Sequence, residues 1–355
     1  MLALAAIPMG VEICSLDPTG AAPAGAVSEL VVGGLDDVVA VARTAAGASV
    51  VTYEWEGVPA TSTRHLETHG SVVRPSTRAL EVSQDRAVEK TTFTALQIPV
   101  APWAAVDARD GLDSALARIG SPAILKTRRG GYDGKGQAII DSPDAADAAW
   151  TDLGPAGELV LEGMVDFERE LSIIAVRSVD GEVRSWPLIE NQHRGGILRV
   201  SRAPALRVTP ELQELADGYA SAVLHHFDYV GVLTIELFQV GDALIANEMA
   251  PRVHNSGHWT IEGAATSQFE NHVRAVLGWP LGRTAAIGAS AMINCIGHIP
   301  EPIDLLGIEG VHVHAYGKSA RPGRKVGHVT VTADSVADLE PRLAAALAAL
   351  PADDG

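Results

Sequence analysis

The chain has 355 residues, of which 47% are hydrophobic and 20% charged, which is enough apolar material for about two or three globular lobes and excludes a disordered protein. Its formal net charge of −17 disfavours nonspecific binding to nucleic acid or to an anionic membrane, because both are polyanions. Cys14 and Cys295 lie in no paired-cysteine motif, which argues against a disulfide scaffold or a structural zinc site and favours a reducing cytoplasm.

The sequence also argues against export and membrane insertion. Its apolar opening is short and has no basic flank before it, unlike a signal peptide. No segment has the ~18 uninterrupted apolar residues that a membrane helix requires. We therefore expect a cytoplasmic protein with no membrane partner.

Helices and strands alternate in the first part of the chain. Residues 1–9 predict a helix, 11–17 a strand, 36–45 a helix and 49–56 a strand. This alternation predicts a parallel α/β domain over residues 1–93. Such a domain usually starts with a strand on which its first helix packs, whereas this chain opens inside a helix. We therefore expect a domain that is truncated at its start.

A second domain is predicted over residues 94–284, after a helix over 85–96 with basic positions. The proline-containing connector at Pro99 and Pro102 marks the boundary. Further elements follow in order: an antiparallel run of strands at 158–165, 169–178 and 182–190, a helix at 210–226, strands at 231–240 and 243–250, and a helix at 267–278. The pattern predicts a mixed α/β and α+β fold.

A small β-rich domain is predicted over residues 285–355. Its strands lie at 290–297, 311–317 and 325–333, and an alanine-rich helix ends the chain.

A glycine-dense loop follows the predicted strand at 121–129, which carries Lys126, and leads into a second strand of a hairpin. Glycines let consecutive backbone N–H groups turn toward an anion, and lysines supply compensating charge, so the loop favours a triphosphate. It is not a GxxxxGK[ST] loop, and no helix follows, which argues against a Walker site and a dinucleotide fold. A flexible surface hairpin is the alternative. The loop contains Gly130, Gly131, Tyr132, Asp133, Gly134, Lys135, Gly136 and Gln137.

Two glutamates are predicted to face each other across a hairpin. Strand alternation places Glu236 among apolar neighbours, where a carboxylate is costly without a cation. The Gly241-Asp242 turn then brings the Asn247-Glu248 pair alongside it. Oxygen ligands from neighbouring strands suit Mg²⁺ shared with ATP phosphates. The sequence leaves open the register of this pair, and solvated edge carboxylates are the alternative.

Two polar segments further along the chain favour anion binding. Arg252, His254, Asn255 and His258 follow the second glutamate strand, and arginine suits bidentate recognition of a carboxylate or phosphate. A capped loop with a hydrogen-bonded histidine is the alternative. The third domain adds a basic loop that favours an anionic substrate, or else forms a solvated turn. That loop contains Lys318, Arg321, Arg324 and Lys325.

Five segments together resemble one family of enzymes. GGYDGKGQ, EGMVDFEREL, NQHRGGILR, NEMAPRVHNSGHW and RPGRKVGH are similar to the N5-carboxyaminoimidazole ribonucleotide synthetase family of the ATP-grasp superfamily, from the first residues to about Val331. The resemblance implies an ATP-grasp fold and a ligase of purine biosynthesis. Such an enzyme activates bicarbonate with ATP as carboxyphosphate and carboxylates 5-aminoimidazole ribonucleotide.

The resemblance also implies roles for individual residues. Magnesium would bind Glu236 and Glu248, with Asn247 nearby, while Arg252, His254 and Asn255, with Tyr132, would serve catalysis on bicarbonate and carboxyphosphate. The ribonucleotide would meet Tyr132, Lys318, Arg324 and Lys325. ATP would contact Arg86, Lys126, the loop from Gly131 to Gln137, the connecting segment Glu162, Gly163, Met164 and Val165, and also Glu170, His193, Asn247 and Glu248. The family is commonly dimeric, which implies a homodimer.

The chain departs from the family at its start, where a first strand and a glycine-rich turn are expected before Met1. That turn would bind the phosphate of the ribonucleotide at a helix N-terminus. We expect a truncated gene model. The alternatives for function are a truncated, non-catalytic ATP-binding module and another ATP-grasp carboxylase or ligase.

Overall fold

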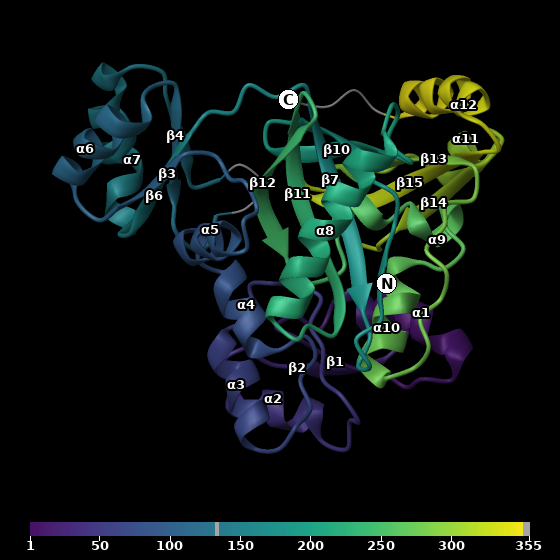
Figure 1. The fold of residues 1–355 in the computed structure, drawn as a ribbon. Helices are drawn as coiled ribbons and strands as arrows, with labels where there is room; N and C mark the ends of the chain where they lie inside the picture. Colours follow the sequence, from purple (N-terminus) through teal and green to yellow (C-terminus); the bar gives the residue numbers. More distant parts are fainter. Residues whose placement is uncertain (132–134, 351–355) are drawn as a thin grey trace.

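The computed structural model describes residues 1–131 and 135–350. A nine-stranded antiparallel sheet forms the centre of the molecule (Figure 1). A four-stranded sheet with its own helices projects to one side, and the N-terminal segment lies below the central sheet in that view.

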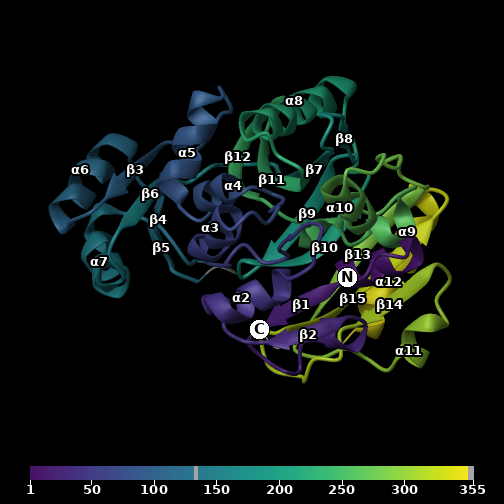
Figure 2. The ribbon, with the colours of Figure 1, turned by 90° about the horizontal axis from the view of Figure 1, so that it is seen from below.

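The N-terminal segment packs short helices around a two-stranded parallel sheet, in which Cys14 pairs with Glu29. In Figure 2, which views the molecule from below, β1, β2 and α2 of this segment lie in the foreground. The side chain of Asp37 begins α2 by accepting hydrogen bonds from the N–H groups of Val39 and Ala40. The elements are α1 (Leu2–Ala6), η1 (Ile7–Met9), β1 (Cys14–Asp17), η2 (Pro23–Ala26), β2 (Glu29–Val32), α2 (Val38–Ala45), α3 (Ala60–Thr68), α4 (Thr77–Ser83) and α5 (Arg86–Ala95).

The strand predicted over residues 49–56 is not a regular strand, and that prediction was wrong. Val51 makes a single parallel bridge to Val73, and residues 52–56 form a loop. The apolar, β-branched sequence favoured a strand, but a β-ladder also needs a continuous partner. The pairing strand of β1 is instead β2, at Glu29–Val32.

The projecting domain is a four-stranded antiparallel sheet in the order β3-β6-β4-β5, covered by α6 and α7 (Figure 1). Its core contains Val106, Leu112, Leu125, Ile140 and Leu161. The elements are β3 (Trp103–Val106), α6 (Arg109–Ile119), β4 (Ala123–Thr127), β5 (Gln137–Ile140), η3 (Pro143–Ala145), α7 (Ala146–Leu153), η4 (Gly154–Ala156) and β6 (Leu159–Gly163). β6 therefore belongs to this sheet, which corrects the prediction that residues 158–190 form one antiparallel run.

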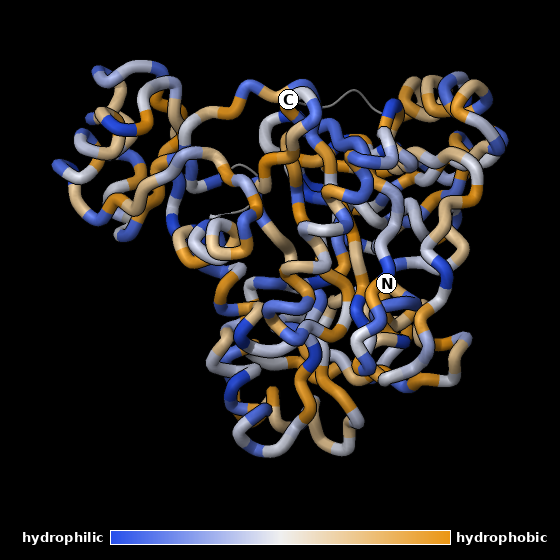
Figure 3. The backbone as a smooth tube through the Cα atoms, viewed as in Figure 1, coloured by the Kyte–Doolittle hydropathy of each residue, from blue (hydrophilic) through white to orange (hydrophobic). Residues whose placement is uncertain are grey.

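The central sheet has the order β12-β11-β7-β9-β10-β13-β15-β14, with β8 paired to β7. Apolar side chains alternate along β7, so that Ile173 packs in the core under α8 and Ile174 in the core under α10. The elements are β7 (Arg169–Arg177), β8 (Val183–Ser185), β9 (Ile189–Arg194), β10 (Ile197–Ala203), α8 (Pro210–His226), β11 (Gly231–Val240), β12 (Ala243–Ala250), η5 (Asn255–Gly257), α9 (Thr260–Gly263) and α10 (Gln268–Leu277). Figure 3 shows hydrophobic segments along the strands of this sheet.

The C-terminal strands continue the same sheet rather than forming a separate one. Val200 on β10 pairs with Ile293 on β13, and β13 pairs in turn with β15. The elements are β13 (Ala289–Ile296), α11 (Pro302–Leu306), β14 (Val311–Ala315), β15 (Lys325–Ala333) and α12 (Val336–Ala349). Across residues 1–131 and 135–350, the structure contains no helix that is long and apolar enough to cross a membrane.

Candidate active site

A β-bulge brings the two glutamates of the β11–β12 hairpin together. Ile235 pairs with Met249 and Leu237 pairs with Ala246, so the register shifts between these pairs. Glu236 is therefore opposed by two residues, Asn247 and Glu248. The turn that closes the hairpin has Gly241 at a φ of 58°, a conformation that glycine adopts without strain. The structure thus resolves the register that the sequence left open.

The charge at this bulge favours a bound cation. Burial and the neighbouring charge of Glu248 raise the pKa of Glu236 to about 7. Burial opposes ionisation of Glu248 as well, but the guanidinium of Arg86 lowers its pKa. Two close carboxylates with amide oxygens beside them are a donor set that Mg²⁺ accepts, provided that phosphate oxygens complete its shell. Among the residues that the structure describes, no group of three or more His, Cys, Asp and Glu side chains could hold a metal ion alone.

Helix α5 carries positively charged side chains that lie beside Glu248 and Glu162. Its N-cap is the fully buried Asp85, which accepts hydrogen bonds from the N–H groups of Ala87 and Val88. In the first turn, Arg86 Nη1 lies 2.8 Å from Glu248 Oε2. One turn further on, Lys90 is only 1% exposed and its Nζ lies 3.0 Å from Glu162 Oε2. Spacing of four residues places Arg86 and Lys90 on one face of the helix.

Glu162 is shared by two lysines. Lys126 Nζ lies 3.1 Å from the same Oε2 atom that Lys90 contacts. Glu162 Oε1 is buried and has no hydrogen-bond partner among the described residues. Burial lowers the pKa of Lys126, and the charge of Glu162 partly opposes this shift. The trio is therefore a buried site with more positive than negative charge and one open acceptor atom.

The ends of the glycine-rich loop are fixed to β4 and α5. Arg128 Nε and Arg129 Nη2 each lie 2.7 Å from a carboxylate oxygen of Asp85. Gly136 has a φ of 70°, and a Cβ there would lie 2.7 Å from Thr127 Oγ1, so a larger residue would not fit. Gly131, Lys135 and Gln137 flank the tip, and Gln137 pairs with Lys126. Tyr132, Asp133 and Gly134, which we expected to contact ATP and substrate, lie outside the described residues.

Two of the predicted nucleotide contacts, Glu170 and His193, lie close enough to Glu236 to shift its pKa. His193 Nδ1 on β9 lies 2.7 Å from Glu170 Oε2 on β7. β6 of the small sheet ends at Gly163, whose N–H donates to the carbonyl of Pro102. Met164 and Val165 follow it and lead from the small sheet to the central sheet. Met164 is 43% exposed, which leaves apolar surface for a flat ring.

The loop after β12 is clamped by Gln268 of α10, whose amide bonds both the N–H and the carbonyl of His254. His254 Nδ1 accepts a hydrogen bond from the N–H of Ser256, so the ring proton lies on Nε2, which is 3.4 Å from Glu236 Oε1. Burial and the nearby Arg252 lower the pKa of His254 well below its usual value, which keeps the imidazole neutral. Arg252 Nε lies 2.6 Å from Glu56 Oε2.

The basic loop of the C-terminal segment contacts this clamped loop through Lys325. Lys325 Nζ contacts Asn255 Oδ1. Lys318 lies on the exposed part of the loop, with its Nζ 5.6 Å from the centre of the Tyr316 ring, and Arg324 donates to Ser319. Burial and the charge of Arg324 lower the pKa of Lys318, while Glu54 and Asp17 oppose that shift. The loop thus faces the N-terminal segment.

Three residues of this region were not predicted from the sequence. Lys90 was visible only as a basic position of a helix, although its spacing from Arg86 was a usable signal. Glu89 is 2% exposed and accepts the N–H of Met249, beside Glu248. Glu56, the partner of Arg252, lies in the segment that was wrongly predicted as a strand. The contacts of Glu89 and Glu56 each join segments more than 150 residues apart.

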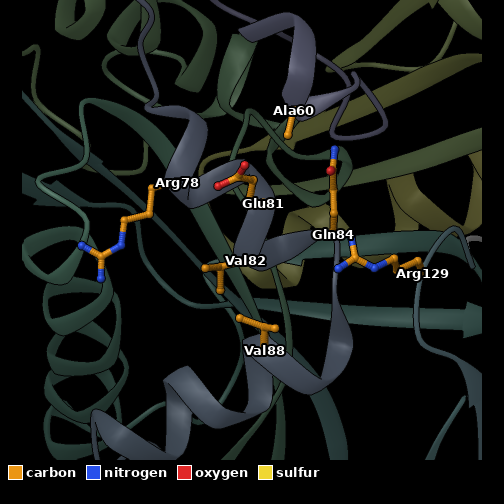
Figure 4. Close-up of a pocket in the computed structure, with 7 residues that line it drawn as sticks. All are labelled: Ala60, Arg78, Glu81, Val82, Gln84, Val88 and Arg129. Carbon is orange, nitrogen blue, oxygen red and sulfur yellow. The ribbon is translucent and has the colours of Figure 1, made fainter. Parts of the chain in front are cut away.

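A hollow of about 360 Å³ lies between α4, α5 and Arg129, and neither Glu236 nor Glu248 lines it (Figure 4). Its polar groups are already paired: Arg78 with His226, Glu81 with Arg64 and Arg129 with Asp85. None of the predicted site residues lines it. The lining residues are Ala60, Arg78, Glu81, Val82, Gln84, Val88 and Arg129.

Comparison with known families agrees with this geometry. Residues 91–269 match the ATP-grasp domain, residues 1–84 the ribonucleotide synthetase preATP-grasp domain, and residues 290–342 the phosphoribosylaminoimidazole carboxylase C-terminal domain. The chain is therefore an ATP-grasp enzyme, and the predicted fold class is confirmed.

Individual relatives identify the family of ATP-grasp enzymes to which the chain is similar. The N5-carboxyaminoimidazole ribonucleotide synthase of Pseudomonas aeruginosa is 45% identical, over 97% of this chain and 94% of that protein. The crystal structure of the synthetase from Thermus thermophilus is 51% identical, with a TM-score of 0.96 over 100% of this chain and 96% of that one. The Aspergillus clavatus synthase, in complex with ADP and 5-aminoimidazole ribonucleotide, is 29% identical, with a TM-score of 0.91 over 98% of this chain and 94% of that one. The chain belongs to the N5-carboxyaminoimidazole ribonucleotide synthase family and is thereby an ATP-dependent ligase.

Proposed function

We propose that this chain carboxylates 5-aminoimidazole ribonucleotide to N5-carboxyaminoimidazole ribonucleotide in purine biosynthesis, with ATP and bicarbonate as co-substrates and carboxyphosphate as the intermediate. The observation that carries this proposal is the convergence of three charged segments. The lysines beside Glu162 lie close enough to Glu248 for their charge to lower its pKa, and His254 Nε2 in the clamped loop lies 3.4 Å from Glu236 Oε1. The ADP and 5-aminoimidazole ribonucleotide complex of the Aspergillus clavatus relative supports the substrates.

We assign magnesium to Glu236 and Glu248, with the amide of Asn247 nearby. The raised pKa of Glu236 supports this assignment, because two adjacent carboxylates are mutually destabilising until a cation joins them. Bound there, magnesium would offset the charge of the ATP phosphates. Arg86 Nη1 lies 2.8 Å from Glu248 Oε2 and would orient that carboxylate.

ATP is assigned to the space between the small sheet and β7. Lys126 and Arg86 would offset the phosphate charge, and the loop from Gly131 to Gln137 would close over the phosphates. The buried Glu162 Oε1, which has no partner among described residues, supports a ligand donor such as the adenine amine at that atom. The paired Glu170 and His193 are assigned to the ribose and the nucleotide pocket.

Bicarbonate is assigned to Arg252, His254 and Asn255. An oxygen of bicarbonate attacks the γ-phosphorus, the bond to the β-phosphate oxygen breaks, and ADP leaves with that bond's electron pair. His254 is neutral and presents its Nε2 proton, so it would donate a hydrogen bond rather than remove a proton. Arg252 is oriented by Glu56, which supports a fixed bidentate contact with the carboxyl group.

The ribonucleotide is assigned to Lys318, Arg324 and Lys325, together with Tyr132 by resemblance to the family. Its exocyclic amine attacks the carboxyl carbon of carboxyphosphate, the C–O bond to phosphate breaks, and inorganic phosphate leaves with the electron pair of that bond and takes up the proton that the amine loses. Carboxyphosphate hydrolyses readily, so the site must exclude water during this step. The resemblance of the chain to its family also supports a homodimer.

One assay separates this function from a non-catalytic ATP-binding module. Phosphate release is measured with ATP, magnesium and bicarbonate, in the presence and absence of 5-aminoimidazole ribonucleotide. We expect release that requires bicarbonate and is stimulated by the ribonucleotide. ATP binding without stimulated release would support the non-catalytic module instead, and stimulation by a different acceptor would support another ATP-grasp ligase.

A further inference from the structure

Lys325 is held by two side chains of the loop that follows β12. Its Nζ contacts Asn255 Oδ1 and lies 3.0 Å from His258 Nδ1. Asn255 begins the 3-10 turn η5, and His258 directly follows that turn. Lys325 itself begins β15, some 70 residues further along the chain. The lysine therefore joins the clamped loop to the C-terminal strands.

The chemistry of this contact fixes the state of the histidine. An ammonium group only donates hydrogen bonds, so His258 Nδ1 must be the acceptor. The ring proton then lies on Nε2, and the imidazole is neutral. Burial and the charge of Lys325 lower the pKa of His258 well below its usual value, which agrees with that state.

A column of stacked rings holds the His258 imidazole in place. One face lies against Phe269, with ring centres 5.4 Å apart, and the other face lies against His328 at 4.8 Å. His328 is fully buried, and the Tyr316 hydroxyl lies 2.6 Å from its Nδ1. His314 stacks on the far face of His328 at 4.3 Å. Because the rings lie within 14° of parallel, His258 cannot rotate without displacing its neighbours.

We propose that His258 is a positioning residue for Lys325: its Nδ1 atom is a fixed acceptor that, together with Asn255, aims the ammonium group at the carboxyl group being transferred to the ribonucleotide. This inference rests on the function proposed above. Asn255 is assigned to bicarbonate and Lys325 to the ribonucleotide, so the ammonium lies where the two substrates meet. A lysine side chain has four rotatable bonds, and without a second acceptor its charge would spread over many positions.

The test compares two substitutions that separate the ring from its acceptor atom. His258→Phe keeps an aromatic ring for the stack but removes the acceptor. His258→Asn loses the ring but places an amide oxygen near the position of Nδ1. The matched control is His312→Phe, an exposed histidine on the edge strand β14. Each variant is assayed for kcat and KM with the ribonucleotide and with ATP, and for the ratio of phosphate released to carboxylated product.

For His258→Phe we expect kcat/KM for the ribonucleotide to fall roughly 10-fold or more, because a hydrogen bond to a charged group is lost. The KM for ATP should stay within about twofold, and phosphate release should exceed product formation. His258→Asn should recover most of the loss, and His312→Phe should match the wild type. In a Lys325→Met background, His258→Phe should cause little further loss.

Three results would overturn the proposal: wild-type kinetics in His258→Phe, an equal loss in His258→Asn, or an undiminished effect of His258→Phe in the Lys325→Met background. If His258→Phe does not fold, His258→Gln takes the place of His258→Phe in every comparison, because it also removes the acceptor from the Nδ1 position. Failure of the proposed function is distinguishable, because the wild-type chain itself would then show no phosphate release that depends on the ribonucleotide.

Discussion

Arg86 Nη1 lies 2.8 Å from Glu248 Oε2, which ties the first turn of α5 to the last part of β12. The side chain of Arg86 is only 18% exposed. The guanidinium of Arg86 neutralises part of the charge of Glu248, which magnesium would otherwise have to offset alone. The pair therefore links the N-terminal segment to the proposed metal site.

Glu248→Gln is expected to abolish turnover, because the amide supplies no negative charge for magnesium and leaves Arg86 without its carboxylate partner. Steady-state phosphate release at saturating magnesium is the measurement. Glu309→Gln, at an exposed ion pair with Arg342, is the control and should retain full activity. Unchanged turnover in Glu248→Gln would rule out the proposed metal role.

Lys90→Met is expected to weaken ATP binding roughly 10-fold. Glu162 would then be paired with Lys126 alone and would draw the Lys126 ammonium group away from the ATP phosphates. Loss of one partner from a buried ion cluster should also lower the free energy of unfolding by about 3 kcal/mol. Calorimetric titration with ATP and thermal unfolding check the two effects. An ATP affinity equal to that of the wild type would show that Lys90 has only a structural role.

Lys318→Ala is expected to weaken ribonucleotide binding roughly 10-fold, because a charged contact to an anion is lost at an exposed loop. The KM for each substrate, measured with the other at saturation, provides the check. ATP affinity should not change. If it did, Lys318 would have to be reassigned from the ribonucleotide to the nucleotide.

His272 is expected to make the protein sensitive to acid. It is fully buried, its Nδ1 accepts the N–H of Val232, and burial lowers its pKa to about 4. Unfolded histidine has a pKa of about 6.5, so below that pH the unfolded state binds the extra proton and stability falls. At pH 5 this single group should cost about 2 kcal/mol relative to pH 7.

The check is the apparent free energy of unfolding of the wild type and of His272→Asn at both pH values. Asparagine keeps an acceptor near Nδ1 but does not titrate, so the variant should lose about 2 kcal/mol less between pH 7 and pH 5. Equal losses in the two proteins would show that His272 does not titrate with a lowered pKa.

The β11–β12 hairpin shows what the sequence could predict. Its two strands have the predicted bounds, because apolar alternation on each side of a Gly-Asp turn is a local signal. Its bulge was not predicted, because a bulge depends on how the partner strand is packed. Likewise, β6 has a clear strand pattern, but nothing local shows that it pairs with β4 rather than with β7.

The sequence indicated candidate residues for the site by their chemical type, but it did not indicate the ion pairs that join them. Glu236, Lys126 and Asn255 stand out because their chemistry is unusual for their surroundings. Lys90 and Glu56 look like ordinary surface residues in the sequence, since only the fold brings them to Glu162 and Arg252. Burial of a charged residue is a property of distant segments and has no local signal.

The continuous pairing from β10 through β13 to β15 means that the C-terminal segment is not a detachable module. Removal of residues 285–350 would leave the backbone groups of β10 unpaired along one side and would uncover Val200. A newly exposed, apolar edge strand is a template for association with other chains. Shortened or domain-swapped versions of this enzyme are therefore expected to aggregate, whereas exchange of the small projecting sheet, which has its own core, leaves the central sheet intact.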